Sequence, residues 1–307
     1  MQLSVIICSY NPVDAFFKEC LAAAFAANEI EKVREILLID NNSNPSLASR
    51  DYVSAFLSTN ANARIIVETQ QGLTPARLRG MKESVGDVIC FVDDDNIVDK
   101  DFFQQVLAVA EKYPFIGSFS GNVTLDFETP PPVWLSRYAG LLVQTVVERD
   151  IWSNNADSRE IMPCGAGLCI RKEVADHYAN IHNQGLRTIK LDRSGDSLMS
   201  SGDNDIALCA CDIGMGMGLF SALRLRHRIP ARRLTKEYIR RLVYGISYSS
   251  EVLCYIRGKK IQPRRLTTKV KELVLPFTMR PFDASIYRTG IRGQRDAKKW
   301  ALQNIPR

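Results

Sequence analysis

Short, largely apolar runs that end in polar or acidic residues recur along the first half of the chain. The runs are Leu3–Cys8, Glu35–Asp40, Ala63–Glu68 and Asp87–Val92, and segments long enough for a helix separate them. Strands that alternate with helices of this length are typical of βαβ units and a mostly parallel sheet. The pattern therefore predicts an α/β fold whose strands end at one common carboxyl edge.

Three consecutive carboxylates follow the fourth run. The five apolar residues Val88–Val92 are typical of a strand that is buried on both faces. Carboxylates do not stay charged inside an apolar core, so Asp93–Asp95 must reach the open edge where α/β sheets bind ligands. Asp40 ends the second run at the same edge. The three neighbouring carboxylates repel one another, and a divalent cation bound between them would relieve this repulsion. The alternative is a solvated acidic turn before a helix that starts at Asp99.

The pattern is less regular in the second half. We expect a helix over Asp99–Tyr113, a strand over Phe115–Thr124, a short strand over Gly165–Ile170, a loop over 183–201 and a final strand over Gly214–Arg226. Three consecutive prolines interrupt the segment 126–163. Its aromatic residues Trp134, Tyr138 and Trp152 either line a sugar-binding surface or pack a loop.

The character of the sequence changes at Ala231. Apolar residues recur there every four positions, namely Leu234, Tyr238, Leu242 and Ile246. This spacing predicts an amphipathic helix, and prolines at positions 263, 276 and 281 separate shorter helices after it. We therefore predict an α/β unit over residues 1–230 and a largely helical extension over residues 231–307.

Composition narrows the class of protein. With 307 residues, of which 46% are hydrophobic, the chain can bury a large core. The eight cysteines include no Cys-x-x-Cys pair, so a sulfur-ligated metal is not expected and a reducing compartment is favoured. Neither a signal peptide nor an apolar run of membrane-spanning length is visible, which predicts a cytoplasmic protein.

The charge is distributed unevenly. Residues 231–307 hold 19 Lys and Arg against 5 Asp and Glu, whereas residues 1–230 hold 21 against 29. A basic tail on an acidic body suggests that the tail meets an anionic surface, and a membrane suits its mixture of basic and apolar residues. The equally acceptable alternative is a helical lid that packs on the body. No recognised nucleic-acid-binding motif accompanies the charge, so nucleic acid is not expected as a partner.

Six motifs follow one another along the chain. They are Val5–Asn11, Leu38–Ser43, Gly72–Arg77, Gly86–Asp95, Gly165–Gly167 and Gly202–Asp205. In this order and spacing they resemble the motifs of family-two glycosyltransferases, which have the GT-A fold. The resemblance covers about residues 2–228. It implies a nucleotide-binding half at about residues 1–125 and an acceptor-binding half at about residues 126–230.

The resemblance implies a site for a nucleotide-diphosphate sugar, with a UDP-sugar favoured. The residues that match donor-binding positions are Ser9, Tyr10, Asn11, Asp40, Arg77, Asp93 and Asp94. In the family, the acid at the position of Asp40 hydrogen-bonds the base, and the first acid of the D-x-D pair, here Asp93, reaches the ribose. Asp94 fills the middle position of that pair and is a further candidate for the metal.

The resemblance also implies a divalent metal, Mn or Mg, and a catalytic base. Asp95 matches the carboxylate that holds the metal on the diphosphate. His227 follows the last strand, where some relatives have a metal-binding histidine; a structural role is the alternative. Asp203 matches the base, but Gly202 stands where relatives usually have a Glu, so Asp205 is the substitute candidate.

The expected reaction is an inverting, metal-dependent glycosyl transfer. A metal stabilises the negative charge of a diphosphate leaving group, and a carboxylate can take the proton of the attacking hydroxyl. The expected acceptor is a saccharide or a lipid-linked molecule in bacterial surface-polysaccharide assembly, which would place the protein in peripheral contact with the inner face of the membrane. The alternatives are a phosphohydrolase of the haloacid-dehalogenase kind, with Asp93 as nucleophile, and a non-enzymatic metal-binding module.

Overall fold

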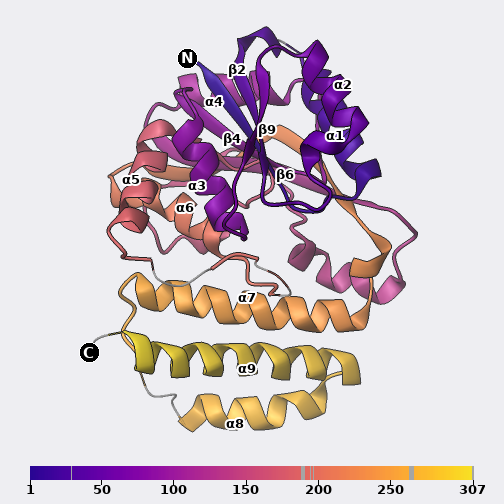
Figure 1. Cartoon of the computed structure of the whole chain (residues 1–307). Helices are drawn as coiled ribbons and strands as arrows, with labels where there is room; N and C mark the ends of the chain where they lie inside the picture. The colour runs from indigo at the N-terminus through magenta and orange to yellow at the C-terminus, as the bar shows by residue number, and fades with distance from the viewer. Residues whose placement is uncertain (29, 188–190, 194, 196, 263–265, 306–307) are drawn as a thin grey trace.

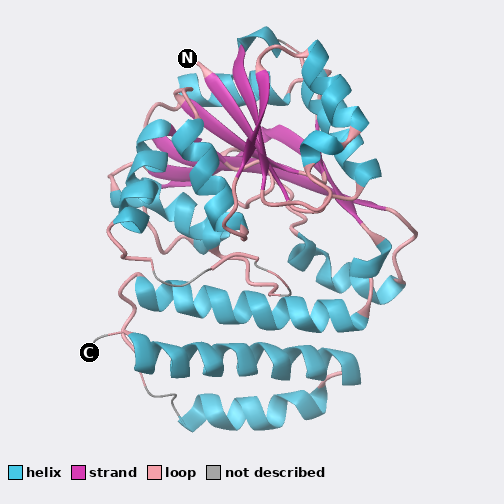
Figure 2. Cartoon of the chain, viewed as in Figure 1, coloured by secondary structure: helices cyan, strands magenta, loops and turns pink. Residues whose placement is uncertain are grey.

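A twisted sheet forms the centre of the protein (Figures 1 and 2). The computed structural model describes residues 1–307 except 29, 188–190, 194, 196, 263–265 and 306–307. Within this described part the sheet has nine strands in the order β3-β2-β1-β4-β8-β6-β9-β5, and β7 pairs with β9 at the side. The strands are β1 (Leu3–Ser9), β2 (Val33–Asp40), β3 (Ala63–Val67), β4 (Val88–Asp93), β5 (Asn96–Val98), β6 (Ile116–Phe127), β7 (Ile151–Ser153), β8 (Cys169–Arg171) and β9 (Gly216–Ile229).

The first half of the sheet is parallel, as predicted. Strands β3, β2, β1 and β4 pair in parallel, and the register places Ser9 beside Asp40 and Cys8 beside Asp93. Successive residues of β1 face opposite layers: Val5 packs in one hydrophobic cluster and Ile6 in the other. This double burial explains why these strands are continuously apolar. The parallel pairing also brings the acidic ends of β2 and β4 to a single edge of the sheet.

The second half mixes directions. Strand β6 pairs with β9 in parallel, but β8 is antiparallel to both β4 and β6, and the short strands β5 and β7 are antiparallel to β9. Strands β5 and β7 were not predicted, because three residues are too few to show a period of two. The helix expected from Asp99 begins at Phe102 instead, because the preceding residues Asn96–Val98 form a strand that pairs with β9. This pairing sets Asn96 opposite His227.

Helices cover both faces of the sheet. Those before the extension are α1 (Asp14–Phe25), α2 (Asp51–Thr59), α3 (Leu73–Glu83), α4 (Phe102–Lys112), α5 (Lys172–Asn183) and α6 (Gly202–Asp212). One hydrophobic cluster joins α1, α2 and α4 to the sheet, and the other joins α3, α5 and α6. The result is a three-layer α/β architecture whose carboxyl edge is left open for a ligand.

The C-terminal extension is helical, as predicted. It contains α7 (Lys236–Ile256), α8 (Leu266–Val274), the 3₁₀ turn η6 (Leu275–Thr278) and α9 (Pro281–Asn304). Figure 1 shows α7 next to the α/β body, α9 beyond it and α8 outermost. Helix α7 buries Leu242 and Val243 against Leu135 and Leu142, which lie in the 3₁₀ segment η3 (Val133–Leu142). The inner part of the extension is therefore packed firmly on the body.

The aromatic residues of the irregular segment pack against protein. The rings of Trp134 and Tyr138 lie 5.2 Å and 5.5 Å from that of Phe282 at the start of α9. Trp152 is half exposed, and its ring lies 4.8 Å from that of Phe115. Of the two interpretations left open, packing therefore describes Trp134 and Tyr138, which connect η3 to the extension.

Candidate active site

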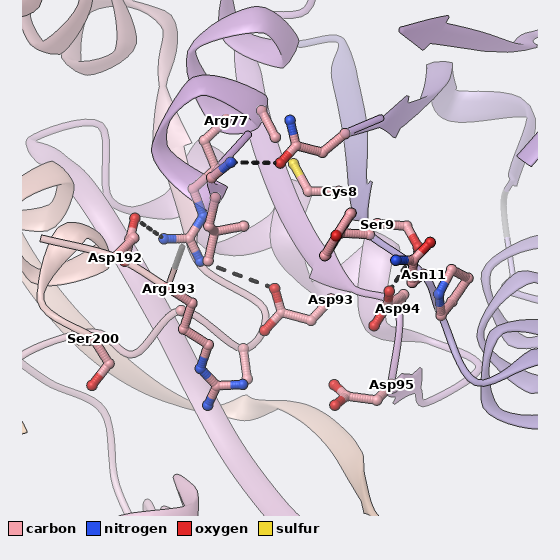
Figure 3. A pocket seen from close by; sticks show the side chains of 18 of the residues that line it. Cys8, Ser9, Asn11, Arg77, Asp93, Asp94, Asp95, Asp192, Arg193 and Ser200 are labelled. Carbon is pink, nitrogen blue, oxygen red and sulfur yellow. Dashed lines mark hydrogen bonds and ion pairs between the residues drawn. The ribbon is translucent and has the colours of Figure 1, made fainter. Parts of the chain in front are cut away.

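A cavity of about 390 Å³ opens at the carboxyl edge of the sheet. This volume lies within the range of small-molecule sites in proteins. The predicted residues that line it are Ser9, Tyr10, Asn11, Arg77, Asp93, Asp94, Asp95, Asp203 and His227. Figure 3 shows side chains from distant parts of the sequence converging there. Asp40 and Asp205 are not among the lining residues.

The loop after β1 forms one wall. Ser9 donates a hydrogen bond to Asp94 through its hydroxyl, with 2.7 Å between Oγ and Oδ2 (Figure 3). Asn11 has a positive φ of 47° and connects this loop to the next one: its N–H donates to Ser43 Oγ and its Oδ1 accepts from the N–H of Asn44. Tyr10 is left half exposed beside the cavity. Its ring is available for a planar ligand.

Asp40 supports the site from behind. It is buried, and both of its oxygens accept backbone hydrogen bonds, from the N–H groups of Ser43 and Leu47 at 2.8 Å each. The structure therefore does not bring Asp40 to the cavity; its carboxylate holds the loop after β2. The lining residue at this strand end is Asn41, whose Oδ1 accepts from the N–H of Gly72. Asp40 was predicted because it ends the second strand and matches the base-binding acid of the family that the sequence resembles.

Arg77 on α3 is the central buried cation. Its guanidinium lies 3.4 Å from Asp192 and 4.0 Å from Asp93 (Figure 3). Burial alone would lower its pKa, but the charges of Asp192, Asp93 and Asp203 raise it, so Arg77 stays protonated. Asp192 also accepts hydrogen bonds from the Thr74 hydroxyl and the N–H of Gly202. One cation thus lies among several carboxylates and reduces their mutual repulsion.

Asp203 lies at the N-terminus of α6 and faces the cavity. One carboxylate oxygen accepts from the N–H of Gly165 and the other from the N–H of Asn204, both at 2.8 Å. Burial raises the pKa of Asp203 to about 6, although Arg77 acts in the opposite direction. A carboxylate with a pKa near 6 is ionised at neutral pH and is a stronger base than an ordinary aspartate.

Asp205 has a different role from the one considered in the sequence. Its carboxylate is buried between two arginines, with Arg187 Nε at 2.7 Å and Arg257 Nη1 at 2.8 Å. It therefore connects α6 to α7 and does not reach the cavity. The helix geometry explains the difference, because residues two apart on a helix point in different directions.

Asp95 and His227 lie close together, and both line the cavity. The Nε2 atom of His227 lies 3.4 Å from Asp95 Oδ2, while its Nδ1 N–H donates to the carbonyl of Leu142. Arg233 completes the group: its Nη1 lies 3.2 Å from Asp95 Oδ2 and 3.2 Å from His227 Nε2. Burial would raise the pKa of Asp95, but His227 and Arg233 lower it well below its usual range. Asp95 and His227 are thus both in contact with the positively charged guanidinium of Arg233.

Asp95 and His227 would fit a divalent cation once the guanidinium of Arg233 moves away from them. Asp95 offers a carboxylate oxygen and His227 a ring nitrogen, and both are ordinary ligands of Mn²⁺. Sites of this kind use few protein ligands and take the remainder from substrate phosphates. Burial raises the pKa of neighbouring Asp94 to about 7, with Asp95 contributing to the rise. A cation bound here would favour the ionised form of Asp94.

Four charged lining residues were missed from the sequence: Asp192, Arg193, Arg232 and Arg233. Asp192 and Arg193 lie in the stretch 183–201, whose content of Gly, Ser, Asp and Arg predicted only a loop. Arg233 was counted as part of the basic extension. Its position six residues after His227 was the one available signal, because a strand end places the following turn at the same edge.

Part of the chain matches known proteins in sequence. The family model described as Glycosyl transferase family 2 matches residues 4–179. Two Bacillus subtilis (strain 168) proteins that carry the name glycosyltransferase, EpsH and EpsJ, are 25% and 31% identical over 108 and 110 residues. The alignments cover 35% and 36% of this chain and 30% of each relative. The chain thus matches less than a third of the length of these relatives.

Solved structures with the same fold cover nearly the whole chain. A mannosyltransferase from Pyrobaculum calidifontis in complex with GDP-Man and Mn²⁺ has a TM-score of 0.57 at 15% identity, covering 98% of this chain and 74% of its own. S. aureus TarS 1–349 has a TM-score of 0.52 at 13% identity, covering 99% and 92%. GalNAc-T7 with UDP, GalNAc and Mn²⁺ has a TM-score of 0.54 at 14% identity, covering 99% and 56%.

Proposed function

The chain belongs to glycosyl transferase family 2 and has the GT-A fold, and we propose that it moves a sugar from a nucleotide-diphosphate sugar to an acceptor hydroxyl with inversion. The observation that carries the proposal is the content of one cavity. It combines the acidic end of β4 with the cations Arg77, Arg193 and Arg233 and with a separate carboxylate, Asp203. Family membership favours this reading over a phosphohydrolase or a non-enzymatic metal-binding module.

The residues that line the cavity suggest how the nucleotide-sugar donor binds. A base placed against Ser9, Tyr10 and Asn11 would leave its diphosphate to be bound by Arg193 and Arg233, which line the same cavity. Guanidinium groups pair well with phosphate oxygens. Asp93 remains our candidate for the ribose, and a UDP-sugar our favoured donor. Solved relatives in fold hold GDP-Man or UDP, so the nucleotide is an outcome of the experiment below.

A divalent metal, Mn²⁺ or Mg²⁺, would be held by Asp95 and His227, with Asp94 as the further candidate. When bound, it would stabilise the charge that develops on the diphosphate. Two structures with this fold contain Mn²⁺. The protein's own residues orient this site: the N–H of Arg228 donates to the carbonyl of Asp95, and the Leu142 carbonyl fixes the His227 ring.

Nucleotide binding is the first test. We expect UDP to raise the unfolding temperature of the protein in the presence of Mn²⁺ and much less in its absence, because a ligand stabilises the fold by mass action. Asp95→Asn should lose the Mn²⁺-dependent part, since a neutral amide is a weak metal ligand. Asp126→Asn is the matched control, because Asp126 pairs with Arg226 and Arg228 outside the cavity. Equal Mn²⁺-dependent shifts in all three proteins would contradict the metal site, and GDP in place of UDP would correct the donor.

Arg233 gives a second expectation. Its guanidinium lies within 3.2 Å of both candidate metal ligands, so a metal can bind only if Arg233 moves aside. Arg233→Gln should therefore bind Mn²⁺ more tightly than the parent protein when nucleotide is absent, and should bind nucleotide more weakly. Titration calorimetry measures both affinities. A fall in both would instead assign Arg233 a purely structural role.

The base of the reaction is proposed to be Asp203. An acceptor hydroxyl that attacks the sugar must lose its proton, and a carboxylate within hydrogen-bond reach can accept it. Attack from the side opposite the diphosphate breaks the glycosidic bond and inverts the anomeric centre. Asp203 lies in the same cavity as the β4 acids but on the other half of the fold, which suits this division.

The acceptor and the division of the chain are proposals that rest on the family. We propose residues 1–230 as the catalytic unit, with the donor bound by about residues 1–125 and the acceptor by about residues 126–230. A saccharide or lipid-linked acceptor in bacterial surface-glycan assembly remains our favoured class. Within the described residues, no helix has the length and apolar character needed to cross a membrane.

A further inference from the structure

Helix α8 exposes its apolar side to solvent. Leu266, Val270, Leu273 and Val274 recur at helical spacing along one face and are 76%, 52%, 70% and 54% exposed. Phe277, in the turn η6, continues this face and is 78% exposed. We call these five residues the α8 apolar face. A helix of a water-soluble domain normally buries such a stripe.

The opposite side of α8 is polar, and it faces the protein. Thr268, Lys271 and Glu272 line a groove shared with α9. Glu272 is almost buried and pairs with Arg295 of α9 at 2.8 Å. The helix thus has its usual amphipathic orientation reversed. Figure 1 places it at the outer end of the extension, beyond α9, so its apolar face looks away from the α/β body.

Positive charge surrounds the α8 apolar face. Among the residues from 259 to 280 whose side chains the structure describes, the basic ones are Lys259, Lys260, Lys271 and Arg280, and the one acidic residue, Glu272, is already paired with Arg295. The side chains of Lys259, Lys260 and Arg280 are exposed. The guanidinium of Arg288 lies 6.0 Å from the ring of Phe277, next to the apolar face itself. The surface therefore combines large apolar side chains with a basic surround.

These features identify the class of partner. A second copy of the chain would bring the same positive charge against this one, so self-association through α8 is disfavoured. An anionic bilayer supplies both complements: acyl chains for the apolar face and negative headgroups for the basic surround. The nine residues of α8 are too few to span a bilayer, which needs roughly 20. The geometry therefore suits a helix lying in the plane of the interface.

We propose that α8 and η6 form an interfacial anchor that docks the protein on an anionic phospholipid surface. The anchor is separate from the cavity, so it goes beyond the proposed function and does not depend on it. It also reconciles the two interpretations of the basic extension. Helix α7 packs on the body, as the lid interpretation requires, while α8 presents the membrane-binding side.

Flotation of the full-length protein with vesicles tests the proposal. The protein is mixed with vesicles of phosphatidylcholine alone or of phosphatidylcholine and phosphatidylglycerol in equal parts. We expect flotation with the anionic vesicles at low salt and a marked reduction at high salt, because salt screens the headgroup charge. No flotation with anionic vesicles at low salt would overturn the proposal.

Variants locate the anchor. The triple variant Val270→Ser, Leu273→Ser, Phe277→Ser should lower vesicle affinity by at least about tenfold per substitution, because each loses a buried apolar side chain. Val133→Ser with Val146→Ser is the matched control, since both residues are highly exposed but lie outside the extension. Equal flotation of the triple variant and the parent would overturn the assignment to α8.

Two further readouts separate the alternatives. All these positions are exposed, so each variant should keep the UDP and Mn²⁺ shift in unfolding temperature, and loss of vesicle binding with that shift intact supports the anchor. Failure of the nucleotide shift in the parent would count against the proposed function alone. Sedimentation equilibrium that finds a dimer in the parent and a monomer in the triple variant, without vesicle binding, would replace the membrane by a second copy.

Discussion

Asp203→Asn is expected to lower the rate of sugar transfer by about 10²–10⁴-fold, the usual contribution of a general base. The amide keeps the shape of the side chain but cannot accept a proton. It can accept only one of the two backbone hydrogen bonds, from Gly165 and Asn204, so a stability loss of about 1–3 kcal/mol should accompany the change. Steady-state kinetics on folded protein separate the two effects, because nucleotide affinity should stay nearly constant.

The pH profile gives an independent readout of the same group. The pKa of Asp203 is raised to about 6 by burial, and only the ionised form is a base. The value of kcat/KM should therefore fall as the pH drops through about 6, and Asp203→Asn should remove this dependence from the residual activity. A similar profile in both proteins would assign the titration to another group.

Asp205→Asn is the matched control for this prediction. Asp205 lies two residues away but pairs with Arg187 and Arg257, so its amide variant should lose stability and keep its rate of transfer. The opposite result, with transfer lost in Asp205→Asn and retained in Asp203→Asn, would make Asp205 the base.

Arg77→Met should destabilise the protein by about 3–5 kcal/mol, the usual result of removing one partner from a buried ion pair. Its guanidinium is 3% exposed and lies between Asp93 and Asp192, with Asp203 contributing to the same field. Methionine fills much of the volume but leaves these carboxylates without a counter-charge. Urea denaturation measures the free energy of unfolding.

The loss should depend on pH in a defined direction. Without Arg77 the pKa of Asp203, already about 6, should rise further above its value in the unfolded chain. The native state then binds protons more tightly than the unfolded state, so the stability of the variant should increase as the pH falls from 8 to 5. Arg79→Met is the control: Arg79 is more than a third exposed and pairs with Glu83, so about 0.5 kcal/mol or less is expected. Equal losses in the two variants would contradict the central role of Arg77.

The sequence was most informative where local chemistry has one physical solution. The five apolar residues before Asp93–Asp95 predict a buried strand that delivers charge to an edge, and β4 does this. The amphipathic helix expected from the spacing of Leu234 to Ile246 is likewise a local pattern, and α7 confirms it from Lys236 onward. Such features depend on neighbours within a few residues, which the sequence displays directly.

The features that were missed depend on contacts between distant residues. Asp192 meets Arg77 across 115 positions, and nothing in the loop around it shows that partner. The reversed orientation of α8 was hidden for the same reason. Its periodicity defines an apolar face but does not tell which side will contact α9. Asp40 is the opposite case, since it was predicted at the cavity and does not line it. Its oxygens accept hydrogen bonds from backbone N–H groups, and such contacts leave no mark on the sequence.

The close contact between Gly202 and Asp192 makes the residue type at position 202 depend on the residue type at position 192. A Cβ at residue 202 would lie 2.1 Å from Asp192 Oδ2, and Asp192 is buried and held by Arg77 and Thr74. No side chain at 202 can therefore coexist with Asp192 in its present place. A relative that carries the usual Glu at 202 should have a small residue at 192, and an alignment of the family should show the two positions covarying. The acid beside the base would then come from residue 192 in this chain and from residue 202 in such a relative.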